Sequence, residues 1–253
     1  MTTSGKHRSV ADATRCQEPE GISVAVRMEL EPTDPACASA RSCPNAPWIL
    51  TRDSQQRLIL RRREGPRTRP LCLSFDAEDI RRRASEGRRA LIARALGFKG
   101  GEYRIVDLTA GLGRDLATCA WLGMTVDAWE RHPLMYALLD DAWKRCTPEL
   151  QQRIRLHRGG ATSTQWQAAD AVLYDPMYPA SKRDGAAPGL EMQHLRALLG
   201  SDDDVEFQFA ALRARPPRRL AIKRPPRGVR VQLAAPDFSQ RGGRVHWDVY
   251  LGH

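Results

Sequence analysis

The stretch VDLTAGLGRD, residues 106–115, decides the expected fold of this chain. It reads as a buried strand, a tight glycine turn and the start of a helix. Gly111 and Gly113 carry no side chains at the point where a ligand would approach the backbone. The first amides of the following helix would face that ligand, because they have no partner within the helix. The pattern therefore predicts a site for a nucleotide-like cofactor.

Strand-like and helix-like segments alternate after this turn. Strands are expected at residues 125–129, 154–157, 171–174 and 219–223. Helices are expected from Pro133 to Ala142 and at residues 190–199 and 205–214, and β-rich segments at 229–233 and 245–251 would form a late hairpin. Alternation over this length predicts an α/β fold with a doubly wound, mostly parallel sheet, which we assign to residues 79–253.

The part of the chain before residue 79 has a different pattern. Residues 1–20 are polar and aperiodic, so we expect them to be disordered. Short strand-like runs follow at residues 22–30, 47–51, 57–62 and 70–75, with a proline-containing loop at 31–47. They predict a small antiparallel β unit over residues 21–78. Residues 79–97 then predict a helix that Gly87 divides in two.

The charge of the chain favours an anionic partner. Its 253 residues carry a formal net charge of +10, and the pI is near 9.8. Nucleic acid is the first candidate and an acidic membrane the second, with a solubilising surface charge as the structural alternative.

The six cysteines form no CxxC pair and no zinc-ligand spacing, so we expect no metal. We find no apolar run of signal-peptide or membrane-spanning length, and we expect a cytoplasmic location without membrane association.

Three polar features follow successive predicted strands, at the sheet edge where open α/β folds bind ligands. They are Arg114 and Asp115 after the glycine turn, the pair Glu130 and Arg131, and the segment 175–178, Asp-Pro-Met-Tyr. Glu130 could accept hydrogen bonds from ribose hydroxyls. Taken singly, each feature has a structural alternative, such as a helix-dipole acid or a surface ion pair. Together, on one edge, they predict a cofactor site.

Two details indicate which cofactor it is. Leu116 stands where the dinucleotide fingerprint requires a third glycine, which counts against NAD. The segment 175–178 resembles the Asn/Asp-Pro-Pro-Tyr/Phe motif of S-adenosylmethionine-dependent amino-group methyltransferases. Asp175 and the Pro176 carbonyl would accept the two N–H bonds of an exocyclic amine and orient its lone pair. Tyr178 would stack on the base.

Four segments, 107–115, 130–133, 174–179 and 222–225, together resemble the small-subunit (16S) ribosomal RNA guanine-N2 methyltransferase J family (RsmJ). The resemblance implies a bacterial class I enzyme with a seven-stranded Rossmann-like sheet. Such an enzyme transfers a methyl group from S-adenosylmethionine to N2 of a guanine in 16S rRNA. The implied cofactor residues are Asp107, Gly111, Gly113, Arg114, Asp115, Glu130, Arg131, Gly159, Gly160 and Asp175. Gly159 and Gly160 replace a serine pair of the family, so hydroxyl contacts are lost there.

Two basic segments are candidate RNA contacts. The first includes Arg81, Arg82 and Arg88, and the second includes Lys223 and Arg224, within a run from 213 to 230 that has eight basic residues and no acid. The structural alternative for both segments is a solvated face of the protein.

Three alternative functions stay open for the protein as a whole. They are methylation of a DNA adenine or a protein glutamine, a nicotinamide-dependent oxidoreductase, and an RNA-binding assembly protein.

Overall fold

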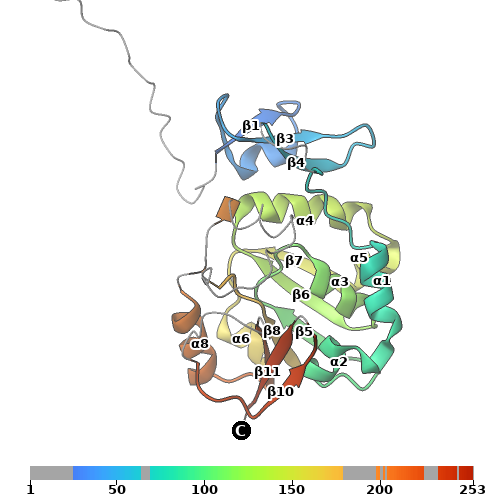
Figure 1. Ribbon diagram of the computed structural model, residues 1–253, viewed down its shortest axis with the longest axis vertical. Helices are drawn as coiled ribbons and strands as arrows, with labels where there is room; N and C mark the ends of the chain where they lie inside the picture. The colour runs from blue at the N-terminus through green and yellow to red at the C-terminus, as the bar shows by residue number, and fades with distance from the viewer. Residues whose placement is uncertain are drawn as a thin grey trace, which may run out of the picture.

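The computed structural model describes residues 25–63, 69–178, 198–199, 202, 204–224, 233–243 and 245–252. A seven-stranded sheet with helices on both faces forms the larger part, and a four-stranded sheet lies beyond helix α4 (Figure 1). The predicted α/β fold with a small β-rich N-terminal unit is confirmed. The division at 21–78 and 79–253 stays a prediction, and residues 1–20 lie outside the described residues.

The larger sheet has the strand order β10-β11-β9-β8-β5-β6-β7. Its strands are β5 (Arg104–Asp107), β6 (Thr125–Glu130), β7 (Ile154–Arg158), β8 (Ala171–Tyr174), β9 (Arg219–Arg224), β10 (Phe238–Arg241) and β11 (His246–Leu251). The strands from β9 to β7 are parallel, and β11 is antiparallel to both of its neighbours. The chain runs from β5 outward to β7 and then returns to β8 on the other side of β5. Open α/β sheets bind ligands at such a reversal of strand order.

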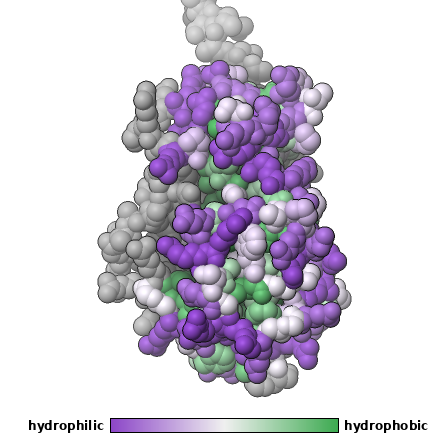
Figure 2. Space-filling view, turned by 90° about the vertical axis from the view of Figure 1, so that its right-hand side faces the viewer, coloured by the Kyte–Doolittle hydropathy of each residue, from purple (hydrophilic) through white to green (hydrophobic). Residues whose placement is uncertain are grey.

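Helices cover both faces of this sheet, and each face has its own hydrophobic cluster. One cluster includes α2 (Leu91–Leu96), α3 (Arg114–Trp121) and α4 (Pro133–Arg145), and the other includes α6 (Ser163–Gln167) and α8 (Val205–Ala214). Side chains alternate between the clusters along the strands, as Ile105 and Val106 do in β5. Helix α1 (Glu78–Ser85) packs on α3. The outer surface on this side of the molecule is largely hydrophilic (Figure 2).

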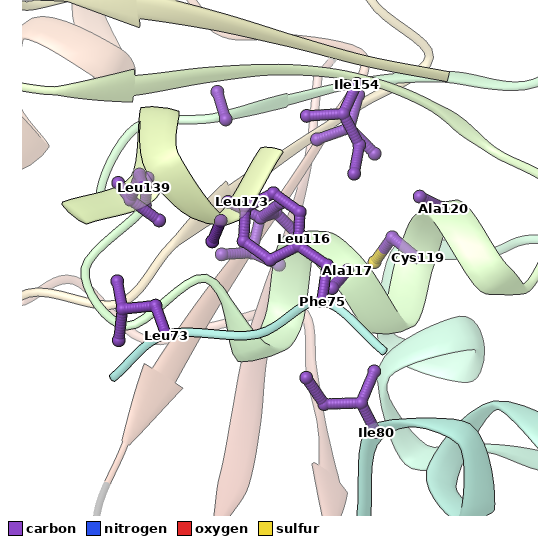
Figure 3. Packing of buried hydrophobic residues seen from close by; sticks show 14 of the residues in the cluster. Leu73, Phe75, Ile80, Leu116, Ala117, Cys119, Ala120, Leu139, Ile154 and Leu173 are labelled. Carbon is purple, nitrogen blue, oxygen red and sulfur yellow. The ribbon is translucent and has the colours of Figure 1, made fainter. Parts of the chain in front are cut away.

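Tight packing fixes the glycine turn from the side of the core (Figure 3). Phe75 is buried beside α3, and its carbonyl accepts a hydrogen bond from Trp121 Nε1 at 2.9 Å. A Cβ on Gly113 would lie 2.5 Å from the Phe75 ring and 2.9 Å from Leu139, and the φ of Gly113 is +73°. The missing side chain of Gly113 therefore makes room for the core, whereas the sequence analysis expected it to make room for a ligand.

The smaller sheet has the order β2-β1-β3-β4, and the prediction that it is antiparallel is wrong. Its strands are β1 (Ala25–Glu29), β2 (Arg41–Ser42), β3 (Trp48–Arg52) and β4 (Leu58–Arg62). Strand β1 is parallel to β2 and to β3, and only β3 and β4 are antiparallel. The predicted loop 31–47 contains the 3-10 helix η1 (Pro35–Ser39) and β2, and it carries the chain back to the end from which β1 started, as parallel pairing requires.

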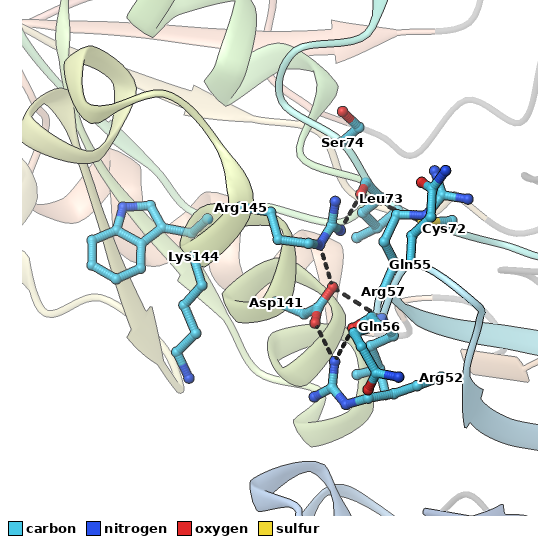
Figure 4. A network of polar contacts seen from close by, with 12 residues as sticks. Arg52, Gln55, Gln56, Arg57, Cys72, Leu73, Ser74, Asp141, Lys144 and Arg145 are labelled. Atoms are coloured by element: carbon cyan, nitrogen blue, oxygen red, sulfur yellow. Dashed lines mark hydrogen bonds and ion pairs between the residues drawn. The ribbon is translucent and has the colours of Figure 1, made fainter.

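Polar contacts join the smaller sheet to α4 (Figure 4). Asp141 of α4 accepts hydrogen bonds from Arg52 Nη1 at 2.8 Å, from Arg145 Nε at 2.8 Å and from the Leu58 amide at 3.1 Å. Arg52 also pairs with Asp34 at 2.6 Å. The hydrophobic cluster continues across the same joint. The smaller sheet is thus fixed to the helix that follows β6.

Most remaining elements lie where the sequence predicts, and the exceptions are local. Helix α1 ends at Ser85, and Gly87 begins a 3-10 turn that leads to α2, so the predicted helix is divided at Gly87 as expected. The predicted strand at 70–75 is wrong, because that segment forms a single bridge, Leu60 to Leu71. The sequence analysis missed α5 (Pro148–Arg153), α6 and β10. Two predicted elements lie mostly outside the described residues. They are the helix at 190–199, of which 190–197 is not described, and the β-rich segment at 229–233, of which 229–232 is not described.

Candidate active site

The carboxyl ends of the central strands meet at the reversal of strand order. The loop after β5 contacts β6, because the Ala110 amide donates to the Trp129 carbonyl at 2.9 Å. The same loop contacts β8, because Thr109 Oγ1 accepts a hydrogen bond from the Asp175 amide at 2.8 Å. The glycine turn and the end of β8 are therefore direct neighbours, as the strand order requires.

Glu130, at the end of β6, holds the glycine turn. Its carboxylate accepts hydrogen bonds from the amides of Gly111 at 3.0 Å and His132 at 2.7 Å. Burial raises the pKa of Glu130, and these amides oppose the rise. A Cβ on Gly111 would meet only the Thr109 carbonyl, at 3.7 Å, so this side of the turn is open. A carboxylate with unused lone pairs beside an open turn fits the hydroxyl groups of a nucleoside.

Gly159 and Gly160 follow β7 and border open space. The Gly159 amide donates to the Glu130 carbonyl at 2.9 Å, and its φ of +104° is a conformation that favours glycine. A Cβ on either residue would meet no atom of the described residues within 4 Å. The end of β7 therefore presents backbone, without side chains, next to the end of β6.

A chain of alternating charges crosses the site from α1 to β8. Arg83 of α1 pairs with Asp115, Asp115 pairs with Lys223 of β9 at 2.6 Å, and Lys223 pairs with Asp175 at 2.8 Å. Burial acts to raise the pKa of Asp115, but Lys223 and Arg83 outweigh it and hold that pKa well below its ordinary value. The two carboxylates likewise raise the pKa of Lys223 against the effect of burial. Each oxygen of Asp115 thus carries one cation.

Asp175 is the accessible end of this chain of charges. Its side chain is 32% exposed, whereas the side chain of Asp115 is 9% exposed. Burial and the neighbouring Asp115 raise the pKa of Asp175, and the ammonium of Lys223 opposes them. A carboxylate that is partly open and fixed at one oxygen can accept a hydrogen bond from an incoming ligand.

Asp107, at the end of β5, is closed off from solvent. Burial raises its pKa to about 8, although its Oδ1 accepts a hydrogen bond from the Thr109 amide at 3.0 Å. It is therefore mostly protonated at neutral pH and contributes little negative charge to the site. Arg114 extends from the first turn of α3, where it pairs with Asp79 of α1 at 3.6 Å.

Arg131 and two aspartates hold the segment that follows β8. Asp202 accepts a hydrogen bond from the Met177 amide at 2.7 Å, and its own amide donates to the Met177 carbonyl at 2.9 Å. Arg131, next to Glu130, pairs with Asp202 and, at 2.9 Å, with Asp204. The predicted cofactor residue Arg131 is thus also a brace for the loop that carries Asp175.

Tyr178 and Pro176 are less available than the sequence analysis expected. Tyr178 as a residue is only 7% exposed, and the guanidinium carbon of Arg224 lies 5.3 Å from its ring centroid. The Pro176 carbonyl already accepts a hydrogen bond from the Tyr178 amide at 3.0 Å, which leaves one lone pair. Stacking of a base on Tyr178 therefore requires Arg224 to move.

The candidate RNA contacts do not lie together. Arg81 and Arg82 are exposed on α1, whereas Arg88 lines a hollow at the amino ends of β5 and β6, at the opposite edge of the sheet. Lys223 and Arg224 have side chains that are 26% and 14% exposed, and both contact carboxylates. Their place is inside the site, not on a basic outer surface.

The sequence analysis missed three residues that hold the site together: Arg83, Thr109 and Asp202. Arg83 had a detectable signal, because it lies three residues after the buried Ile80 and so shares its helix face toward α3. Thr109 lies within the quoted glycine stretch, but nothing in its neighbours shows that its hydroxyl meets β8. Asp202 precedes α8 without a motif of its own.

None of the described helices has the length and apolar character needed to cross a bilayer. The described residues also contain no group of three histidine, cysteine or acidic side chains placed to hold a metal ion.

The sheet order, the open glycine turn and the acid at the end of β6 fit an S-adenosylmethionine-dependent methyltransferase, and the comparisons with known proteins show that the chain is one. Residues 39–252 match the family described as "Putative SAM-dependent methyltransferase". The crystal structure of a SAM-dependent methyltransferase from Neisseria gonorrhoeae is similar, with a TM-score of 0.63 and 26% identity over 90% of this chain and 96% of that chain. S-adenosylmethionine is therefore the cofactor.

Curated relatives identify the family more closely. Ribosomal RNA small subunit methyltransferase J of Alkalilimnicola ehrlichii is 36% identical in an alignment that covers 88% of this chain and 93% of that protein. The protein of the same name from Pseudoalteromonas atlantica is 34% identical in an alignment that covers 80% of this chain and 85% of that protein. The chain belongs to the ribosomal RNA small subunit methyltransferase J family, which confirms the resemblance seen in the sequence.

Proposed function

We propose that this enzyme transfers a methyl group from S-adenosylmethionine to the N2 amine of a guanine in 16S rRNA. The observation that supports this most directly is Asp175, a partly exposed carboxylate beside the glycine turn whose second oxygen is held by Lys223. The names of the relatives, which are small-subunit rRNA methyltransferases, support the substrate class.

The open edge of the sheet supports a cofactor site. When bound, S-adenosylmethionine supplies an electrophilic methyl group on a sulfonium. Glu130 would accept hydrogen bonds from its ribose, and the open side of Gly111 would leave room for it beside the turn. Gly159 and Gly160 would offer backbone contacts only. The remaining expected contacts are Asp107, Gly113, Arg114, Asp115, Arg131 and Asp175.

Asp175 would orient the amine of the substrate. The lone pair of an exocyclic amine is delocalised into the ring, so the amine is a poor nucleophile until its N–H bonds are fixed. Asp175 accepts one N–H bond, and the free lone pair of the Pro176 carbonyl accepts the other. Tyr178 would contribute to base stacking after Arg224 has moved. Positioning of this kind supplies much of the rate enhancement.

The surface over α1 would contact the RNA backbone. Arg81 and Arg82 are exposed on α1, and α1 is linked to the site through Arg83. A net charge of +10 favours association with a polyanion. A guanine within a helix would have to leave its stack to reach Asp175.

Transfer of labelled methyl groups tests this proposal. The acceptors are naked 16S rRNA, small subunits and precursor particles from cells that lack the gene product, and the product nucleotide is identified by mass spectrometry. We expect N2-methylguanine with the wild-type enzyme and a loss of about 100-fold or more with Asp175→Ala. Asp170→Asn is the matched control, because Asp170 lies just before β8 at the opposite edge of the sheet.

Labelling of a DNA adenine or a protein glutamine in preference to all three RNA acceptors would contradict the rRNA proposal. Competition among these acceptors in one reaction separates the possibilities. An unchanged rate in Asp175→Ala would contradict the role of the carboxylate, whichever acceptor is methylated.

A further inference from the structure

Lys223 occupies the centre of the site, although its sequence context suggested an RNA contact. Its Nζ donates to Asp115 Oδ2 at 2.6 Å and to Asp175 Oδ2 at 2.8 Å. The ring of Trp247, from the adjacent strand β11, lies 5.6 Å from the same nitrogen. Two carboxylates and an aromatic face therefore hold the ammonium from three elements.

The hydrogen bonds divide the two oxygens of Asp175. Lys223 takes Oδ2, the Asp175 amide is held by Thr109, and no described residue donates a hydrogen bond to Oδ1. The carboxyl plane is thus fixed at one oxygen while the other keeps its capacity to accept. An N–H bond of the substrate needs such an acceptor in a fixed direction.

Acidic groups surround Asp175 on several sides. Burial raises the pKa of Asp175, and Asp115 of α3 and Asp202, before α8, raise it further by repulsion. Asp107 of β5 is a third acid nearby, and the phenol of Tyr178 is held neutral by burial, which raises its pKa. Lys223 is the cation in direct contact with Asp175, and Arg83 of α1 acts one step away, through Asp115. Without Lys223 the carboxyl group would tend to take up a proton.

We infer that Lys223 is a positioning residue for methyl transfer: it keeps Asp175 ionised and fixes the direction of its free oxygen, while Asp115 and Arg83 keep Lys223 in place. This inference rests on the proposed role of Asp175 in binding an amine. It assigns Arg83 and Asp115 a supporting function, and it removes Lys223 from the set of RNA contacts.

The pH dependence of methyl transfer tests the inference. Lys223→Met removes the charge and keeps most of the side chain, and Lys223→Arg keeps the charge. We expect Lys223→Met to lower kcat about 100-fold near neutral pH with a small change in the KM for RNA. In a plot of kcat against pH, we also expect the acid limb of Lys223→Met to lie about one pH unit or more above that of the wild type. Activity of the variant should therefore partly return in alkaline buffer. Lys223→Arg should restore part of kcat and the wild-type acid limb.

A second readout does not depend on activity. Titration of the Asp175 carboxyl carbon by NMR, assigned by comparison with Asp175→Asn, should give a higher pKa in Lys223→Met than in the wild-type protein. S-adenosylhomocysteine binding, measured by calorimetry, shows that the variant is folded. Lys144→Met is the matched control, because Lys144 pairs only with the surface residue Asp140, at 2.7 Å, among the contacts described. If Lys223→Met does not fold, Lys223→Gln takes its place.

Three outcomes would overturn the inference. They are an unchanged Asp175 pKa in the variant, a lower kcat with an unmoved acid limb, or a defect confined to the KM for RNA. The last would restore Lys223 as an RNA contact. Absence of rRNA methylation by the wild-type enzyme would instead refute the proposed function, and the NMR titration would still decide whether Lys223 controls Asp175.

Discussion

Two aspartates of this enzyme each hold two cations, and they do so in different parts of the molecule. Asp141 joins Arg52 of the smaller sheet to Arg145 of α4 (Figure 4), and Asp115 joins Arg83 of α1 to Lys223 of β9. Their side chains are almost equally buried, at 10% and 9% exposed. The local chemistry is therefore very similar.

The two networks differ in where the cations lead. Arg52 also donates to the Gln56 carbonyl at 2.6 Å and to the Asp34 carboxylate at 2.6 Å, and Arg145 donates to the Leu73 carbonyl at 2.8 Å. The network of Asp141 therefore ends on backbone carbonyls and on Asp34, whose side chain is only 9% exposed. Lys223 instead leads from Asp115 to Asp175, a side chain that is 32% exposed. We infer that a network of buried ion pairs only stabilises the fold when all its members are held in place. Such a network can take part in catalysis when one of its members is accessible to a substrate.

The largest expected effect is on catalysis, in Asp115→Asn. The amide keeps the size of the side chain but no longer attracts Lys223, which loses one of its two carboxylate partners. We expect methyl transfer to fall about 100-fold near neutral pH. Initial rates at saturating cofactor measure the effect. The matched variant Asp141→Asn should keep the rate per folded molecule within about twofold, because it is not connected to Asp175. Equal losses in both variants would contradict the distinction between the networks.

The second effect is on stability, in Asp141→Ala. This substitution removes the carboxylate to which Arg52 and Arg145 donate, and it leaves the Leu58 amide without its acceptor. We expect the free energy of unfolding to fall by about 2 kcal/mol, less than for a fully buried pair because both arginines remain partly exposed. Urea denaturation gives the value. Asp140→Ala, which removes only the surface pair with Lys144, should cost less than about 0.5 kcal/mol. A cost for Asp141→Ala no larger than that of Asp140→Ala would show that the joint does not depend on the network.

Glu130 extends the comparison to a carboxylate that holds backbone amides. In Glu130→Gln the amide oxygen can keep one of the hydrogen bonds from Gly111 and His132, but the NH2 group cannot accept the other. We expect S-adenosylhomocysteine to bind about 10-fold more weakly, which is about 1.4 kcal/mol. Calorimetry measures the affinity, and Glu149→Gln on the exposed face of α5 is the control. Unchanged affinity would argue against a ribose contact at Glu130.

The sequence predicted the parts of this site that depend on strand position. Glu130 and Asp175 each follow a periodic apolar segment, so the edge on which they meet could be derived from the alternation of strands and helices. The partners of the charges could not be derived. Lys223 lies in a basic run, and only the pleat of β9, which puts it on the same face as Ala221, turns it toward Trp247 and Asp115. Long-range contacts of this kind have no local pattern. The same limitation explains the wrong pairing in the smaller sheet, where the return path through β2 sets the direction of β1 and β3.

Asp107 differs from both Asp115 and Asp141, because this buried carboxyl group pairs with no cation among the described residues. Its pKa is raised from 3.8 in an exposed chain to about 8 in the fold, so the folded protein binds a proton that the unfolded chain releases. The contribution of Asp107 to the free energy of unfolding therefore falls as the pH rises from about 4 to about 8. Asp107→Asn keeps an acceptor for the Thr109 amide and cannot ionise. We expect Asp107→Asn to gain stability relative to the wild type as the pH rises from 5 to 8.5, because only the wild-type group changes its protonation on unfolding in this range. Urea denaturation at both pH values measures the difference. An advantage that shrinks as the pH rises would mean that Asp107 is ionised in the folded protein and that Lys223 serves three carboxylates, not two.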